Sequence, residues 1–139
     1  MQKIKKLTED NYLLAVFWTL KKDFYYHDYI IKSWAIFVKE DYILFSKLEN
    51  EDNYPIVEFA TKWNDYLKVE LYEISKSNIL KYIDELEEYP KLYSRIILKT
   101  LWWENCIVYA YNWKIKNDIK NRYLDFEKDW KKFYNWTWI

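Results

Sequence analysis

The most unusual feature of this sequence is an absence, because it contains no glycine. Average usage of about 7% would place roughly ten glycines in a chain of this length. Only one cysteine, Cys106, is present, which excludes an internal disulfide and fits a reducing compartment. The longest apolar run, residues 12–18, is far shorter than a membrane span, and the N-terminus lacks the residue order of a secretion signal. We therefore expect a cytoplasmic protein with no membrane partner.

Net charge is absent too, since 22 Lys and Arg balance 22 Asp and Glu. No overall field favours nucleic acid or an acidic membrane as a partner. Apolar and aromatic residues, by contrast, reach 51% and 22% of the chain, with nine tryptophans, which excludes wholesale disorder. The length and the absence of any linker or repeat predict a single domain over residues 1–139. Its core would lie at about 13–113, followed by a charged C-terminal tail at 114–139.

Short apolar or alternating segments predict seven strands, at residues 13–18, 35–38, 42–45, 56–60, 66–74, 93–101 and 106–113. The charged residues 39–41 would form a turn between the second and third of these strands. Residues 50–55, which combine Asn, Asp and Pro, would form a loop. A short helical turn is expected at 29–31. The predicted fold class is therefore α+β, a small strand-rich sheet or barrel with one central helix.

The strongest helix prediction covers residues 77–88. Ser75 or Ser77 would cap its N-terminus, and Pro90 would prevent its continuation. Apolar residues recur at spacings of three and four and define one buried stripe: Ile79, Leu80, Ile83 and Leu86. The remaining charged residues would face solvent: Lys81, Asp84, Glu85 and Glu88.

Glu87 falls on the buried stripe, four positions after Ile83. A carboxyl group aimed at a core is costly unless it is paired, hydrogen-bonded or neutral. Such a group can hold a raised pKa and exchange protons near neutral pH. The alternative is an ordinary acid at a helix end, or one paired with Arg95, and the spacing alone favours that alternative. For Arg95 we expect a structural ion pair with Asp84 or Glu87.

The other candidate residues have simpler interpretations. His27 is the only histidine, and without a second histidine or a cysteine cluster it predicts no metal site. Cys106, in an apolar strand, is expected to be an inert core residue. Exposed aromatic rings can stack on sugars or single-stranded bases. Aromatic residues in predicted strands are, however, far more typical of a core.

Several segments, taken in order, resemble the gamma-glutamylcyclotransferase-like family, of the gamma-glutamylamine cyclotransferase type. They are VELYEI at 69–74, IDELE at 83–87, YSR at 93–95 and VYAY at 108–111. The family pattern is a G-E-L-Y-like strand, a helix ending in L-D-x-x-E-G, then Y-x-R and a Y-V-Y-like strand. Upstream, FWTLKKD at 17–23 with His27 is similar to the family's opening Y-G-T-L-K-K-G and N-H. The resemblance covers roughly residues 13–113.

The resemblance implies a small mixed β-barrel with one central helix and flanking helical segments. It also implies cyclisation of a small-molecule gamma-glutamyl substrate to 5-oxoproline with release of an amine or amino acid, and no metal or organic cofactor. Glu87 would then be the catalytic acid and base. Phe17, Trp18, Thr19 and Leu20 would form the substrate loop, whose backbone amides bind the substrate's carboxylate or oxyanion. Tyr93 would also bind substrate, and Arg95 and Asp84 would support the site.

Four family glycines are replaced in this sequence, by Trp18, Asp23, Val69 and Glu88. Glycine permits a positive φ and a close approach of backbone to ligand, so the indole of Trp18 would occupy the place of the substrate. This supports a second hypothesis, a non-catalytic member of the fold whose pocket binds a ligand or a partner. A third, a sugar-stacking module, would need a planar row of exposed Trp away from Glu87.

The excess of tryptophan suggests a further hypothesis about the genetic code. Some codes read UGA as glycine and another reads it as tryptophan, so translation with the wrong table would place Trp where Gly belongs. This fits Trp18 directly, and it extends to the turn-like positions of Trp34, Trp63, Trp103 and Trp136. It does not account for the other replaced glycines, and a chain designed without glycine is the alternative.

Overall fold

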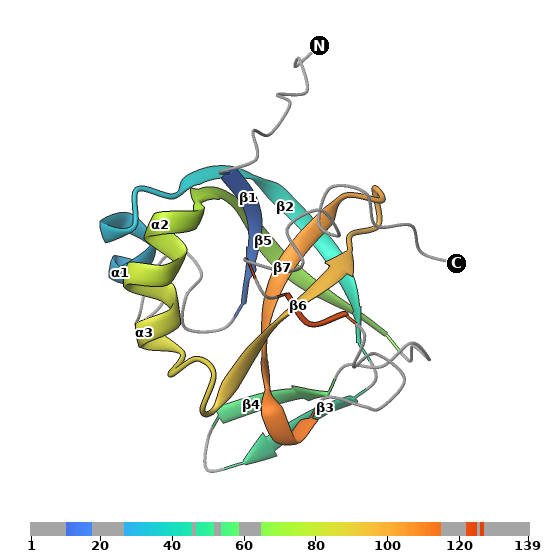
Figure 1. The fold of residues 1–139 in the computed structure, drawn as a ribbon. Helices are drawn as coiled ribbons and strands as arrows, with labels where there is room; N and C mark the ends of the chain where they lie inside the picture. The colour runs from blue at the N-terminus through green and yellow to red at the C-terminus, as the bar shows by residue number, and fades with distance from the viewer. Residues whose placement is uncertain are drawn as a thin grey trace.

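A five-stranded mixed sheet, seen in Figure 1, organises the chain. The computed structural model describes residues 11–17, 27–45, 47–51, 54–58, 65–114, 122–124 and 126. The sheet has the order β2-β5-β1-β7-β6. Its strands are β1 (Asn11–Val16), β2 (Ile36–Phe45), β5 (Asp65–Ser75), β6 (Tyr93–Lys99) and β7 (Asn105–Tyr111). Only the β1–β7 pairing is parallel among these neighbours, so the first strand joins two antiparallel halves into one sheet.

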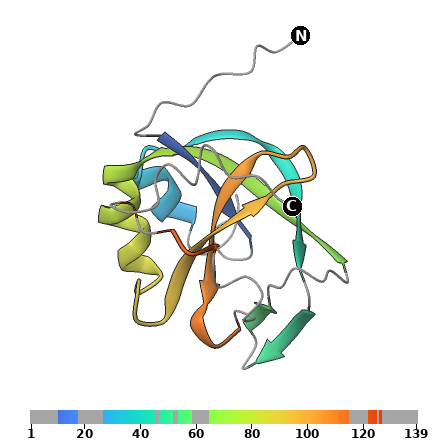
Figure 2. The ribbon, with the colours of Figure 1, turned by 45° about the vertical axis from the view of Figure 1, so that its right-hand side comes forward.

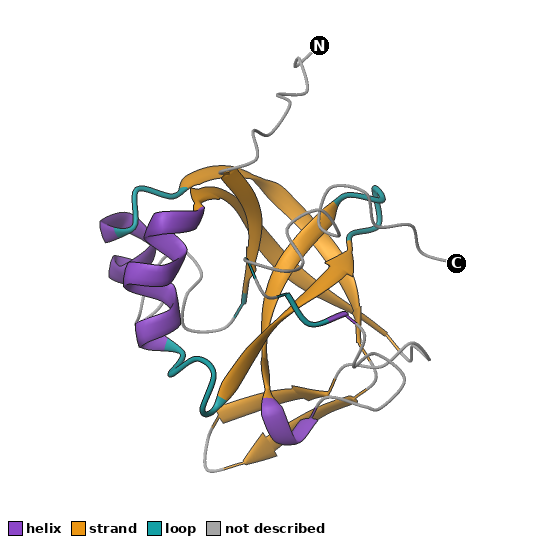
Figure 3. Ribbon diagram, in the orientation of Figure 1, coloured by secondary structure: helices purple, strands orange, loops and turns teal. Residues whose placement is uncertain are grey.

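The remaining elements flank this sheet, as Figure 3 shows. A separate hairpin pairs β3 (Lys47–Glu51) with β4 (Tyr54–Glu58). Helix α1 (His27–Lys32) precedes β2, and a short 3-10 segment (Asn112–Lys114) follows β7. Between β5 and β6 the chain forms one helical rod, made of α2 (Lys76–Asn78), a π-helical segment (Ile79–Ile83) and α3 (Asp84–Leu86). No helix in the described part of the chain combines the length and apolarity needed to cross a membrane.

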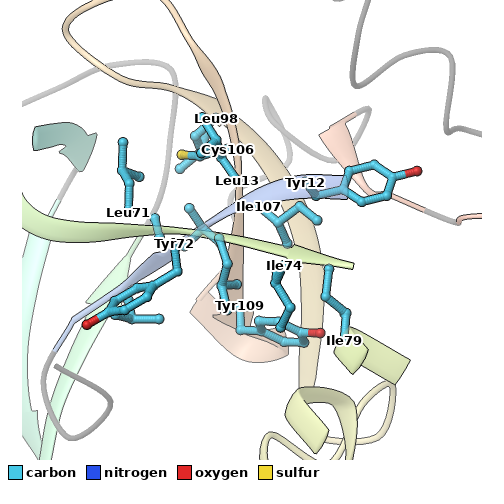
Figure 4. Close-up of a cluster of buried hydrophobic side chains, with 14 of the residues drawn as sticks. Tyr12, Leu13, Leu71, Tyr72, Ile74, Ile79, Leu98, Cys106, Ile107 and Tyr109 are labelled. Atoms are coloured by element: carbon cyan, nitrogen blue, oxygen red, sulfur yellow. The ribbon is translucent and has the colours of Figure 1, made fainter. Parts of the chain in front are cut away.

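The core is built on the central strands, which are covered on both faces. Every residue of β1 from Tyr12 to Val16 is buried, and so is every residue of β7 from Cys106 to Ala110. Strands covered on both sides carry continuous apolar runs rather than an alternating pattern, which is why these two segments were recognisable from sequence. Figure 4 shows the cluster, with Tyr109 reaching toward the helical rod beside Ile74 and Ile79.

The predicted turn at residues 39–41 is wrong. These residues continue β2, which runs from Ile36 to Phe45 with one β-bulge between Phe37 and Lys39. β2 is an edge strand, so its charged side chains can reach solvent or pair across the ladder. Lys68 on β5 lies 2.9 Å from Glu40, and Lys39 pairs with Asp41 at 3.4 Å. The ladder with β5, which local patterning does not reveal, keeps the charged segment in the sheet.

The loop predicted at residues 50–55 is also too long. In the β3–β4 ladder Asn50 pairs with Pro55 and Glu51 with Tyr54, so only residues 52 and 53 connect the strands, and these two lie outside the described residues. The sequence analysis did not predict β3, because Lys47–Glu51 is polar and lacks the β-branched and aromatic residues that favour strands.

The α+β prediction is confirmed, but closure into a barrel is not. In the described part of the chain, the two edges of the sheet meet at an isolated bridge between Ile43 of β2 and Thr100, the residue after β6, and the Leu101 amide donates to the Tyr42 carbonyl at 3.0 Å. Apart from that bridge, β2 and β6 are not paired in the described sheet, so the sheet is open and not a closed barrel. Figure 2 shows the sheet strongly curved with its edges drawn together at this end.

The helical rod matches the predicted helix in place and in its N-cap. Ser75 is extended and its Oγ accepts a hydrogen bond from the Asn78 amide at 3.3 Å. Two residues of the rod lie on the opposite face from the one predicted. Leu80, predicted to be buried, is 46% exposed, and Asp84, predicted to face solvent, is only 8% exposed. The π-helical segment is the reason, because the Asp84 amide bonds to the Ile79 carbonyl five residues back. This wider turn rotates the following residues relative to an α-helical pattern and carries Asp84 inward.

Candidate active site

The candidate site is centred on Glu87, the residue that follows α3 and caps the C-terminus of the helical rod. The Glu87 amide donates to the Ile83 carbonyl at 2.9 Å, and the Tyr89 amide donates to the Asp84 carbonyl at 2.9 Å. Glu88 has a φ of 51° and donates to the Glu85 carbonyl at 3.2 Å. Together these bonds form a Schellman cap, with Glu88 at the left-handed position. The cap fixes the backbone on which the Glu87 side chain stands.

The carboxyl group of Glu87 is held in a dry environment. Its side chain is half-buried, and burial raises its pKa from 4.5 to about 7. Among the described residues none forms a hydrogen bond or ion pair with this carboxyl. An acid in this state is present in both protonation forms near neutral pH, which is what a group that must accept and then return a proton requires.

The charge of Glu87 raises the pKa of two tyrosines on the neighbouring strands β6 and β7. Burial raises the pKa of Tyr93, and the carboxylate of Glu87 raises it further. Burial raises the pKa of Tyr109 well above its usual value. The charge of Asp84 and the hydrogen bond to it raise this pKa further, and the charge of Glu87 adds a smaller increase. Tyr93 pairs across the β6–β7 ladder with Tyr111, and their ring centroids are 5.6 Å apart. The site therefore combines a carboxyl of raised pKa with two phenols that burial keeps neutral, one of which donates a hydrogen bond to Asp84.

A buried polar network lies at the same end of the helical rod as Glu87. The Tyr109 hydroxyl donates to one oxygen of Asp84, and the other oxygen lies 3.6 Å from Nη1 of Arg95. Burial raises the pKa of Asp84, while the Tyr109 hydrogen bond and the Arg95 charge oppose that rise. Of the two ion pairs that the sequence left open for Arg95, the structure shows the one with Asp84. Glu87 is thereby left without a cationic partner in the described residues.

Aromatic rings hold Arg95 in place. Its guanidinium carbon lies 3.9 Å from the ring centroid of Tyr89 and 4.3 Å from that of Phe126, which are cation–π distances. The Arg95 side chain is almost fully buried. Three elements thus meet around it: the helix end through Asp84 and Tyr89, strand β6 through Arg95, and the C-terminal region through Phe126.

Asn112 is a site residue that the sequence analysis missed. Its side-chain amide donates to the Pro90 carbonyl at 2.9 Å and to the Lys91 carbonyl at 3.0 Å, and its backbone amide donates to the Leu92 carbonyl at 2.9 Å. These bonds tie the loop after Glu87 to the end of β7. The only signal in the sequence was an Asn directly after the VYAY segment, which does not reveal a partner some twenty residues away.

The other predicted site residues divide into two groups. Asp84 and Arg95 are brought together by their 3.6 Å contact, and the charge of Glu87 acts on Tyr93 at the start of β6. Phe17 follows β1 and packs against the core. Trp18, Thr19 and Leu20 lie outside the described residues, so the substrate loop stays a prediction.

His27 and Cys106 lie elsewhere. His27 begins α1, with its ring centroid 6.0 Å from that of Tyr72. No group of three potential His, Cys, Asp or Glu metal ligands occurs within the described ranges. Cys106 is fully buried, and burial raises the pKa of its thiol. Both residues have the surroundings of structural side chains.

Comparison with known proteins identifies the fold. An AIG2-like protein from Mus musculus is 24% identical, with a TM-score of 0.62 over 74% of this chain and 78% of its own. A uropathogenic E. coli-specific protein is 17% identical, with a TM-score of 0.61 over 92% and 98% of the two chains. An uncharacterized protein from Pyrococcus horikoshii is 23% identical, with a TM-score of 0.58 over 91% and 99%. No curated protein sequence matches significantly.

The family assignment rests on the sequence as a whole. A family model described as gamma-glutamyl cyclotransferase, AIG2-like, matches residues 14–132, which include the helical rod, both strands of the candidate site and Phe126. The match covers most of the 139 residues, and the neighbouring structures share the α+β arrangement. The chain therefore belongs to the gamma-glutamyl cyclotransferase, AIG2-like family.

Proposed function

We propose that this protein cyclises a small-molecule gamma-glutamyl amine or amino acid to 5-oxoproline and releases the amine, with Glu87 as general acid and base. The observation that carries the proposal is the half-buried Glu87 carboxyl at a helix cap, which has no partner among the described residues and whose pKa burial raises to about 7. The family assignment supports the reaction class. The proposal places the enzyme in the cytoplasm, in keeping with the single cysteine, and with no nucleic-acid or membrane partner, in keeping with the balanced charge.

In this mechanism the Glu87 carboxylate accepts a proton from the substrate's α-ammonium group. The freed amine attacks its own γ-carbonyl carbon, so that a new C–N bond closes the ring. The C–N bond to the leaving amine then breaks as Glu87 returns its proton to the leaving nitrogen. The second proton that the ring nitrogen loses on forming the lactam passes to the released amine, which departs as an ammonium ion. The reaction is intramolecular, so the protein gains chiefly by holding a folded conformer of the substrate.

The raised pKa of Glu87 suits the first proton transfer. An α-ammonium group has a pKa of about 8 and an ordinary glutamate one of about 4.3, and each unit of difference costs about 1.4 kcal/mol. Transfer to an ordinary glutamate would therefore be uphill by about 5 kcal/mol. With the pKa of Glu87 at about 7, the same transfer costs about 1.4 kcal/mol. The dry setting thus lowers the cost of the proton transfer considerably.

The test is 5-oxoproline release from a panel of gamma-glutamyl amines and gamma-glutamyl amino acids. Glu87→Gln keeps the shape of the side chain but cannot exchange protons, and we expect kcat to fall by about 10²- to 10⁴-fold. Glu85→Gln is the matched control, because Glu85 is an exposed acid on the same helix end and should leave kcat unchanged. Unchanged turnover in a folded Glu87→Gln protein would remove Glu87 from the mechanism. If the unsubstituted protein and the Glu87→Gln protein both bind a gamma-glutamyl compound but neither releases 5-oxoproline, the result would favour a non-catalytic member of the fold.

A further inference from the structure

Two tryptophans have the left-handed backbone conformation that glycine adopts most readily. Among the described residues, φ is positive only at Trp34 (60°), Glu88 (51°) and Trp103 (64°). A positive φ is uncommon for any residue with a Cβ, and for a bulky residue it is an outlier. Glu88 belongs to the helix cap described above. The two tryptophans need a separate account, because they make up two of the three positions.

Trp34 lies just beyond the end of α1. The Ser33 amide donates to the Tyr29 carbonyl at 3.0 Å, and the Trp34 amide donates to the Ile31 carbonyl at 3.1 Å. This is the bond that closes a helix through a left-handed residue, and glycine is strongly enriched at that position. The backbone of residue 34 therefore has the geometry of a glycine C-cap.

Trp103 lies in the tight turn between β6 and β7. The Trp103 amide donates to the Thr100 carbonyl at 3.0 Å, and the Thr100 amide donates to the Glu104 carbonyl at 2.9 Å. Three residues, 101–103, thus connect the strands, and the last of them is left-handed. This is the hairpin built from a type I turn and a left-handed third residue, which is ordinarily glycine.

The side chains give no reason for tryptophan at either place. Trp34 is 80% exposed and Trp103 is 65% exposed, and no described residue forms a ring contact or hydrogen bond with either indole. The other two described tryptophans, Trp102 and Trp113, are 77% and 80% exposed. Tryptophan is on average highly buried in folded proteins. Four exposed tryptophans in a chain with no glycine point to one common cause.

We infer that residues 34 and 103 are glycine in the protein made by its own cell, encoded by UGA codons that its ribosomes read as glycine. A code that reads UGA as tryptophan yields the printed sequence. The inference rests on the backbone of two turns and on composition, and it is independent of the proposed reaction. It explains together the excess of tryptophan and the left-handed backbone at Trp34 and Trp103.

The decisive experiment reads residues 34 and 103 directly. The codons at both positions should be UGA, and peptides from the protein purified from its source cells should have glycine masses at both. UGG codons, or tryptophan in those peptides, would overturn the inference.

A second measurement tests the backbone argument on recombinant protein. Glycine relieves a left-handed position whereas alanine does not, so Trp34→Gly and Trp103→Gly should have folding equilibrium constants about 5- to 30-fold above Trp34→Ala and Trp103→Ala. Leu101 is the control, because it is exposed in the same hairpin without a positive φ. There the alanine variant should equal or exceed the glycine variant in stability. Equal stability of the glycine and alanine variants at residues 34 and 103 would refute the argument.

The same reading of UGA at residue 18 would place glycine in the predicted substrate loop and remove the indole from it. This consequence rests on the proposed function, and the two ideas fail separately. If residue 18 proves to be glycine and the Trp18→Gly protein still releases no 5-oxoproline, the proposed reaction is wrong while the codon inference stands. If Trp18 is encoded by UGG, the extension to this loop is wrong whatever the activity.

Discussion

The raised pKa of Glu87 predicts a measurable effect of pH on stability. In the unfolded chain this carboxyl titrates near 4.5, and in the folded protein at about 7. Between these values the folded state binds more protons than the unfolded state, so Glu87 makes stability fall as pH rises. Its favourable contribution is complete below about pH 4.5 and is lost above about pH 7. The shift of roughly 2.5 units corresponds to about 3 kcal/mol in the free energy of unfolding.

Urea unfolding at pH 5 and pH 8 measures this effect. Glu87→Gln removes the titrating group, so its stability relative to the unsubstituted protein should rise by up to about 3 kcal/mol between the two pH values. Burial raises the pKa of Asp84 as well, but that group is present in both proteins and largely cancels in the comparison. Glu85→Gln, at an exposed site, should show no such pH-dependent difference. A Glu87→Gln difference that is the same at both pH values would refute the dry environment assigned to this carboxyl.

Two further predictions concern the groups that hold Glu87 in place. Tyr109→Phe removes the hydroxyl that donates to Asp84 and should lower the free energy of unfolding by about 1–3 kcal/mol, measured by urea unfolding; an unchanged value would show that the bond is dispensable. Asn112→Ala removes the side-chain bonds to the Pro90 and Lys91 carbonyls and should lower kcat for 5-oxoproline release at least several-fold while leaving the pH profile in place. Unchanged kinetics in this variant would mean that the loop does not position Glu87.

Local patterns predicted those parts of the fold that depend on near neighbours. The apolar runs gave β1 and β7, because both strands are buried on two faces, and the spacing of Ile79 and Ile83 gave the helix. Ser75 or Ser77 was predicted as the cap, and the structure shows that it is Ser75. Glu87 was singled out because it continues the helix's apolar stripe, and in the structure it is half-buried with a pKa of about 7.

The errors have a common origin in contacts between distant residues. The charged residues 39–41 were predicted as a turn, but pairing with β5 keeps them in a strand. Asp84 was predicted to face solvent, but a π-helical turn directs it toward Tyr109 and Arg95. Neither the ladder partner nor the extra residue in a helical turn can be deduced from apolar spacing.

By itself, therefore, the sequence determined the α+β class, the helix ahead of β6 and the acid at its end, since each follows from residues within a few positions of one another. The sequence also contains the family-like segments in the order typical of the family. Only the tertiary structure decided that Arg95 pairs with Asp84 rather than Glu87, and that Asn112 fastens the loop beyond the helix. The physical reason is that burial and charge pairing depend on which strands the sheet brings together. That arrangement leaves the carboxyl of Glu87 without a cation among the described residues and raises its pKa.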